Sequence, residues 1–237
     1  SDVYKRQVEE RIVSFLYYAE EVQRCLNEER EDEIPAAEAS SYMPGEERWG
    51  GIGKSKDSAS QCYSYFLQRM RSFTAIASIN EEWEMYLQRL QERYIGPENG
   101  AIRYEADAIR LKKEIEKQER EYEYEHLMVY YAFMCLPRCV DDYDFLGKAK
   151  FITASYLMIR DMDMVCMAEN NGVFTAQDRQ KIARIYAKEV EHSEENLDYL
   201  DMTIINMCDR LKLISREQAA ELRETVVREL EKLKKTT

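Results

Sequence analysis

The stretch that decides the fold of this chain runs from Tyr124 to Ala168. It begins with YEHLMVYYAFMCL at residues 124–136, is interrupted at Pro137, and resumes as FITASYLMIRDMDMVCMA at residues 151–168. Both runs are apolar on nearly every side of a 3.6-residue period, which is typical of helices that are buried on all sides. Because proline removes a backbone donor and clashes with the preceding turn, we predict two helices folded back on each other as a central buried hairpin.

The second run is about as long as a membrane span, which needs roughly 17–25 residues. Arg160, Asp161 and Asp163 lie in its middle, and each would cost a few kcal/mol at the centre of a bilayer. The start of the sequence also lacks the basic and then apolar segments of a signal peptide. The pattern therefore predicts the core of a globular protein that has no membrane as a partner.

The composition excludes some classes of partner. A formal net charge of −12 weighs against nucleic acid, which is bound by clustered Lys and Arg, and 45% hydrophobic content is ample for a large core. The six cysteines are scattered, and most lie within apolar helical runs, which predicts reduced thiols and a cytoplasmic location. They are Cys25, Cys62, Cys135, Cys139, Cys166 and Cys208.

The first seven residues, SDVYKRQ, resemble the in-frame translation of a sequencing adapter. Such a scar is left out of fold reasoning, and its presence leads us to expect that the natural chain continues upstream. After it we predict an N-terminal helix over residues 8–30, a long flexible loop over 31–60 that holds two prolines and four glycines, and a helical domain over 61–237. The glycines at 50, 51 and 53 lack a preceding strand and the spacing of a phosphate-binding loop.

Helix signals dominate the rest of the chain. Asn80 and Ser193 are expected N-caps, and Thr175 with Asp178 resembles a capping box. We expect one long helix from Tyr104 to Leu136, with one solvent-exposed face in its first half, and a last helix that begins at Ser215. No stretch alternates apolar and polar residues for long enough to form a strand. We therefore predict an all-α fold of about seven helices around the central hairpin.

Few residues suggest chemistry. Arg160 and Asp163 share a face of a helix that should be buried, so they either form an internal ion pair or line a cleft. His126 and His192 follow Glu125 and Glu191, but neighbours on a helix point about 100° apart, so neither dipeptide is a catalytic dyad by itself. The candidate catalytic residues are Arg160, Asp163, His126, Glu191 and His192. Cys135 and Cys139 have no second pair nearby, so no metal site is predicted.

Three tracts together resemble the C-terminal region of the bacterial flagellin lysine-N-methylase family. They are INEEW at residues 79–83, YEHLMVYY at 124–131, and the ordered run from Phe151 through Gly172 and Thr175 to VEH at 190–192 and Asn196-Leu197. The resemblance covers roughly residues 60–205. It rests on the order and spacing of the tracts.

The resemblance implies methylation of lysine ε-amino groups on flagellin, with S-adenosylmethionine as methyl donor and an iron–sulfur cluster held by an N-terminal cysteine cluster. This sequence has no such cysteine cluster, although thiolates of that kind would hold the iron. The chain is therefore expected to be either the C-terminal portion of such an enzyme or a non-catalytic helical module that binds another protein. Flagellin is the implied partner, and a cysteine-rich segment upstream would favour the enzyme.

Overall fold

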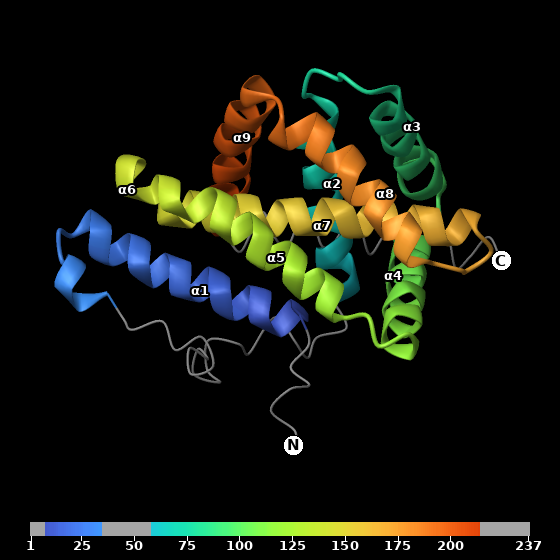
Figure 1. The fold of residues 1–237 in the computed structure, drawn as a ribbon, viewed down its shortest axis with the longest axis horizontal. Coiled ribbons are helices and arrows are strands. Elements are labelled where there is room, and N and C mark those ends of the chain that lie inside the picture. The colour runs from blue at the N-terminus through green and yellow to red at the C-terminus, as the bar shows by residue number, and fades with distance from the viewer. Residues whose placement is uncertain (1–7, 35–57, 214–237) are drawn as a thin grey trace. The chain divides into compact units, whose positions relative to one another are not determined.

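The described residues of the computed structural model, 8–34 and 58–213, form helices and turns without a β-strand, which confirms the all-α prediction for these ranges. Three short turns of other helix types, at Gln91–Ile95, Leu136–Arg138 and Ala187–Glu191, join or extend the α-helices. A further single 3-10 turn, Glu31–Glu33, follows the first helix. The α-helices in order (Figure 1) are α1 (Val8–Asn27), α2 (Ser58–Thr74), α3 (Glu81–Leu90), α4 (Gly100–Lys117), α5 (Tyr122–Cys135), α6 (Cys139–Asp142), α7 (Phe145–Glu169), α8 (Ala176–Tyr186) and α9 (Glu194–Leu213).

The chain divides into two compact units that interleave along the sequence. The first comprises Ser1–Ser55 and Glu119–Leu157, and the second comprises Lys56–Gln118 and Met158–Thr237. Helix α7 therefore contributes its first half to one unit and its second half to the other. The predicted scar, most of the predicted loop and the predicted last helix lie outside the described residues, so those boundaries stay predictions.

Side-chain caps begin three of the helices where the sequence predicts them. The Asn80 side chain accepts a hydrogen bond from the Glu82 amide at 3.0 Å, and Ser193 Oγ accepts one from the Asn196 amide at 3.2 Å. Thr175 and Asp178 form a reciprocal capping box at the start of α8. These bonds satisfy amides that a helix start would otherwise leave without acceptors, which explains why the boundaries are readable from sequence.

The prediction of one long helix from Tyr104 to Leu136 is wrong, because α4 ends at Lys117 and α5 begins only at Tyr122. Glu119 adopts a left-handed conformation with φ 55° at this break. The side chain of Gln118 donates a hydrogen bond to the Phe174 carbonyl at 3.1 Å, and this tertiary contact helps to offset the cost of the left-handed residue. No proline or glycine marks the break in the sequence, so the helical pattern continues through it.

In the first unit, α5 and the beginning of α7 form the predicted hairpin. Tyr124 and Tyr156 meet edge to face with their ring centroids 5.4 Å apart. Helix α1 joins the pair through Gln23, whose side chain donates to the Tyr143 carbonyl at 2.9 Å and accepts from the Leu146 amide at 3.1 Å. These contacts fix the turn between α6 and α7, where Tyr143 is left-handed with φ 55°. At Pro137 itself, where the break was expected, α5 gives way to the 3-10 turn and then to the short α6.

Helix α5 departs from the prediction that the hairpin is buried all round. Its buried residues are Tyr124, Tyr131 and Cys135, whereas Val129 is 53% exposed and Phe133 is 78% exposed. Apolar composition shows which environments a face tolerates, but the neighbouring elements decide which face is covered. In α5 the neighbours cover one face and leave the opposite face in contact with solvent.

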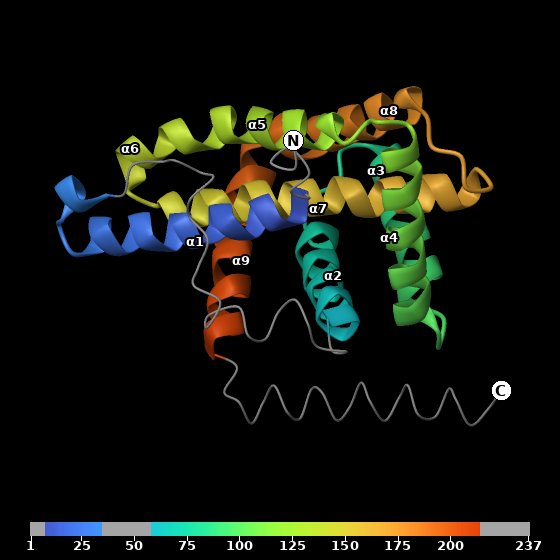
Figure 2. The ribbon, with the colours of Figure 1, turned by 90° about the horizontal axis from the view of Figure 1, so that it is seen from below.

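Helix α7 follows the prediction much more closely. Figure 1 shows it as one unbroken helix, and nearly every residue from Met158 to Met167 is buried. In the second unit α2 and α8 lie on opposite sides of this half of α7 (Figure 2). Across the part of the chain that the structure describes, no helix has a stretch that is long and apolar enough to span a bilayer.

Met158 provides a test of the buried half of α7, because its side chain is fully buried. We expect Met158→Asp to lower the free energy of unfolding by about 3–5 kcal/mol, since a charge without a partner would enter the core. Urea titration followed by circular dichroism measures this loss. The control Met202→Asp, at a position 65% exposed on α9, should cost less than about 1 kcal/mol. Equal stability of the two variants would contradict the packing.

Candidate functional site

The most concentrated group of charged side chains surrounds Asp161 in the second unit. Arg69 on α2 donates from Nε at 3.1 Å and from Nη2 at 2.7 Å to Oδ2 of Asp161. Tyr104 on α4 donates from its hydroxyl to Oδ1 of Asp161 at 2.8 Å and accepts from Arg69 Nη2 at 3.1 Å. The three residues are 0–4% exposed, so a closed triangle of hydrogen bonds joins α2, α4 and α7 in the core.

The electrostatics of this triangle keep Tyr104 and Arg69 each in one protonation state. Burial, and then the Asp161 carboxylate, raise the pKa of Tyr104 to about 12. Burial lowers the pKa of Arg69, but the Asp161 carboxylate and Tyr104 outweigh it, so the net pKa is raised. The tyrosine is therefore a neutral donor and the arginine a cation at physiological pH.

Asp163 forms a second buried pair with a different helix. Its Oδ2 lies 2.7 Å from Nη1 of Arg179 on α8, and the exposed fractions of the two side chains are 0% and 7%. The Arg179 guanidinium also lies over the ring of Phe174, 5.2 Å from its centroid. Successive residues of a helix are rotated by about 100°, so Asp161 and Asp163 point about 200° apart and reach opposite neighbours.

A third buried group of polar residues fixes the connection between α2 and α3. Oε1 of the fully buried Glu189 accepts from the Ile79 amide at 2.7 Å. Asn196 Nδ2 donates to the carbonyls of Ala77 at 3.0 Å and Glu189 at 2.9 Å, and its Oδ1 accepts from the Ala77 amide. Glu189 lies in the π-helical turn Ala187–Glu191, which aims its carboxylate at this connection.

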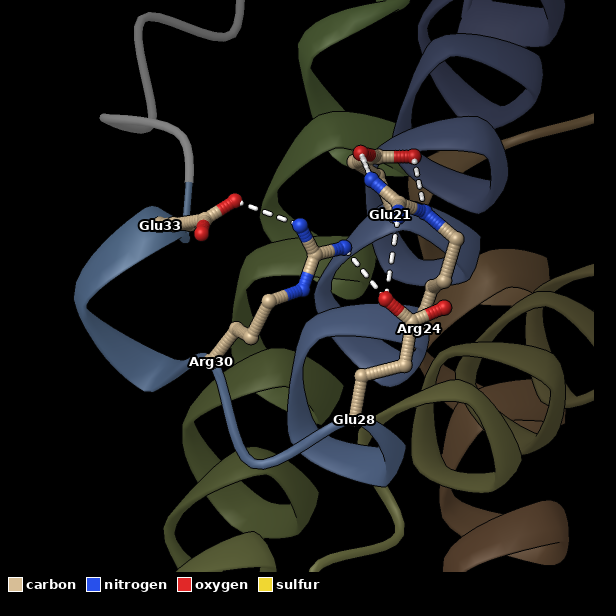
Figure 3. A network of polar contacts seen from close by, with 5 residues as sticks. All are labelled: Glu21, Arg24, Glu28, Arg30 and Glu33. Atoms are coloured by element: carbon tan, nitrogen blue, oxygen red, sulfur yellow. Dashed lines mark hydrogen bonds and ion pairs between the residues drawn. The ribbon is translucent and has the colours of Figure 1, made fainter.

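The exposed ion pairs at the end of α1 differ from these buried groups. Figure 3 shows Arg24 between Glu21 and Glu28, and Arg30 between Glu28 and Glu33. The side chains are 28–55% exposed, and exposed pairs of this kind contribute roughly 0–1 kcal/mol each. We therefore interpret these ion pairs as solvent-exposed contacts at the end of α1 and not as a functional site.

The candidate residues from the sequence lie in different units. His126 is exposed in the first unit, where its ring meets that of Tyr122 at 5.4 Å. In the second unit, Asp163 is fully buried and Arg160 is half-buried. The positive charge of Arg160 partly opposes the net rise in the pKa of Tyr104. His192 is exposed and follows the π-helical turn that ends at Glu191. The described contacts join Asp163 to Arg179, a partner that the sequence analysis does not identify.

Compared with known families, the chain matches the FliB lysine N-methylase C-terminal domain over residues 5–215. The chain belongs to this family. No match was found among curated proteins or among solved structures. The match includes the three tracts that suggest the resemblance and extends beyond them at both ends.

The described part of this FliB C-terminal domain does not fit an iron–sulfur cluster. Cysteines whose side chains are described include the free thiols Cys25, Cys135, Cys139 and Cys166. Among the described side chains, no three His, Cys, Asp or Glu residues come together in a way that could hold a metal ion. It also lacks a strand followed by a glycine-rich turn, a common cradle for nucleotide-like cofactors. We assign no catalytic step to either cofactor here.

The sequence analysis did not identify Arg69, Tyr104 and Arg179 as members of these buried groups. For Arg69 and Arg179, however, the sequence pattern contains an indication. Arg69 lies among Phe66, Met70 and Phe73 on the buried face of α2, and Arg179 begins the face of α8 that Ile182 continues. A lone arginine on an apolar face indicates a buried partner, because an unpaired charge there would be costly. The partners are helices distant in sequence, so only the fold identifies them.

The buried triangle predicts a large difference between breaking and replacing the Arg69–Asp161 pair. Asp161→Asn leaves the Arg69 cation buried without a countercharge, and we expect it to cost about 3–5 kcal/mol of unfolding free energy. The double variant Arg69→Met/Asp161→Leu should recover much of this loss, because it removes both charges. Urea unfolding of the wild type, both single variants and the double variant measures the coupling.

A matched control is the exposed pair Arg89–Glu169, whose atoms lie 3.0 Å apart at 35% and 43% exposure. Glu169→Gln should cost less than about 1 kcal/mol. If the double variant were less stable than Asp161→Asn, the pair would have a role beyond charge balance.

Glu189 predicts a pH dependence of stability in the FliB C-terminal domain. Burial raises its pKa above the ordinary value of 4.5, against the opposing effect of the Ile79 and Asn80 amides. Because the folded state holds this proton more tightly than the unfolded state, the carboxyl group contributes stability below pH 4.5 that is lost as the pH rises through the raised pKa. Thermal melts of wild type and Glu189→Gln from pH 4 to 8 should show the melting temperature of the wild type falling relative to that of the variant as the pH rises. A pH-independent difference would contradict the assignment.

Proposed function

We propose that this chain is the C-terminal helical portion of an enzyme that methylates lysine ε-amino groups of flagellin. The observation that carries the proposal is the family match over residues 5–215, which includes every residue that the structure describes. A net charge of −12 is compatible with a partner that presents lysines, since opposite charges favour encounter.

Within such an enzyme we assign this portion to holding flagellin or closing over a site built by other residues. Methyl transfer needs a deprotonated lysine, whose ordinary pKa is about 10.4, and a base or a dry site that favours its neutral form. The carboxylates of Asp161 and Asp163 are buried and paired with arginines, so they have no open face for a substrate amine. S-adenosylmethionine and the iron–sulfur cluster enter the proposal through the family resemblance alone.

A non-catalytic interaction module is the second candidate. It is favoured by the exposed apolar residues of α5, among them Val129 and Phe133, because such surfaces commonly bind other proteins. Under this alternative the domain would bind flagellin or another protein without any transfer of a methyl group. The two candidates therefore differ in the mass of the bound protein.

Mass spectrometry of flagellin separates the candidates. Flagellin is purified after co-expression either with the 237-residue chain or with the complete protein of the source gene, and each enzyme preparation is analysed for iron. We expect lysine methylation and iron with the complete protein, and neither with the chain by itself. Flagellin expressed without either protein is the control.

Methylation by the 237-residue chain alone would overturn the assignment of this portion to substrate holding. Flagellin that binds but stays unmodified in the presence of the complete, iron-loaded protein would favour the interaction module. Absence of both binding and methylation would contradict the enzyme and any module that binds flagellin, and would leave only a module that binds another protein.

A further inference from the structure

The outer face of α5 carries a row of exposed aromatic, aliphatic and imidazole side chains, which we call the α5 stripe: Tyr122, His126, Val129, Tyr130 and Phe133. Tyr122, Val129, Tyr130 and Phe133 are 52%, 53%, 47% and 78% exposed, and His126 is exposed as well. Their spacing of three and four residues places them on one face of the helix. Over this length α5 rises roughly 16 Å, so the stripe is a long and narrow apolar surface.

The stripe lies opposite the face that α5 buries in its own unit. The inward residues are Tyr124, Tyr131 and Cys135, so α5 is apolar both inside and outside. Packing within the unit requires only the inner face. Aromatic residues that are exposed in a continuous row are enriched at protein–protein interfaces, and Phe133 and Tyr130 are of this type.

Acidic residues lie at both ends of the stripe. Before it, Glu119 and Glu121 are exposed. Within its first turn, Glu125 is half-buried and Glu123 is paired with Arg120 at 2.8 Å. After it, Asp141 and Asp142 are exposed and Asp144 is half-buried, and Asp142 is paired with Lys148 at 2.9 Å. Arg138 is the one exposed cation from Glu119 to Asp144. Both ends therefore attract positive charge, with an apolar surface between them.

This pattern of charge decides between possible occupants. In a symmetric pair of α5 helices, parallel or antiparallel, acidic ends would face acidic ends, which opposes a second copy of the chain. An anionic lipid surface is opposed for the same reason. We propose that the α5 stripe binds an amphipathic helix of another protein that is apolar on one face and carries Lys or Arg at both ends. A row of anchors at helical spacing matches the way in which one helix recognises another.

A synthetic peptide tests this proposal without any methyl transfer, so its outcome is independent of the proposed function. The probe is a fluorescent Leu/Lys peptide designed as an amphipathic helix with lysines at both ends, and binding to the full 237-residue chain is measured by anisotropy. We expect Phe133→Ser and Val129→Ser each to weaken binding about tenfold, since exposed anchor residues dominate such interfaces. The matched control Ile109→Ser, at a position 49% exposed on α4, should leave the affinity unchanged.

A scrambled peptide of the same composition separates the apolar row from general charge attraction. It should bind at least about tenfold more weakly than the amphipathic peptide. Because Phe133 and Val129 are exposed, their variants should keep the wild-type melting curve, and this is measured in parallel. Equal binding of the two peptides, or unchanged affinity of Phe133→Ser, would overturn the proposal.

Two further measurements identify the other possible occupants. Light scattering that shows a dimer in the wild type and a monomer in Phe133→Ser would mean that a second copy covers the stripe. Hydrogen exchange in α5 that becomes faster when the residues after Leu213 are removed would mean that the chain covers its own stripe. Either result would overturn the proposal, whereas a monomer with unchanged exchange supports it.

Discussion

Two buried carboxylates on α7 constrain the second unit. Asp161 and Asp163 are both fully buried, and removing two anions from water costs several kcal/mol each unless a cation and hydrogen-bond donors replace the solvent. Because the two side chains point about 200° apart, one partner cannot serve both. Arg69 on α2 and Arg179 on α8 supply the cations, so the two helices are held at fixed registers against α7.

The buried charged side chains described in this unit have structural partners within it. Asp161 and Asp163 lie paired with arginines in the core, whereas His192 is exposed at the surface of this unit. Glu189 and Asn196 similarly act on the backbone, since they bind the chain between α2 and α3. The buried charges described in this unit therefore hold helices and connecting segments in place. In the first unit, the exposed face of α5 presents apolar side chains to solvent, among them Val129 and Phe133.

The sequence predicted part of this arrangement. Charged residues within an otherwise apolar run indicate buried partners, and on that basis Asp163 and Arg160 were reasonable candidates. The predicted caps at Asn80, Thr175 and Ser193 were confirmed, because a cap depends on residues within one turn of each other. The break at Glu119 was missed, since the hydrogen bond between Gln118 and Phe174 joins residues far apart in the sequence. The family resemblance was confirmed by the match over residues 5–215.

The sequence by itself determined the helical class, the three capped helix starts, the buried character of α7 and the family, because all of these follow from local periodicity, capping and the order of motifs. Tertiary structure alone decided which arginine neutralises which aspartate, since Arg69 and Arg179 reach α7 from opposite sides. It also decided which face of α5 is covered. An apolar helix has no preference of its own between its faces, so the packing of its neighbours assigns one face to the core and leaves Val129 and Phe133 exposed to solvent.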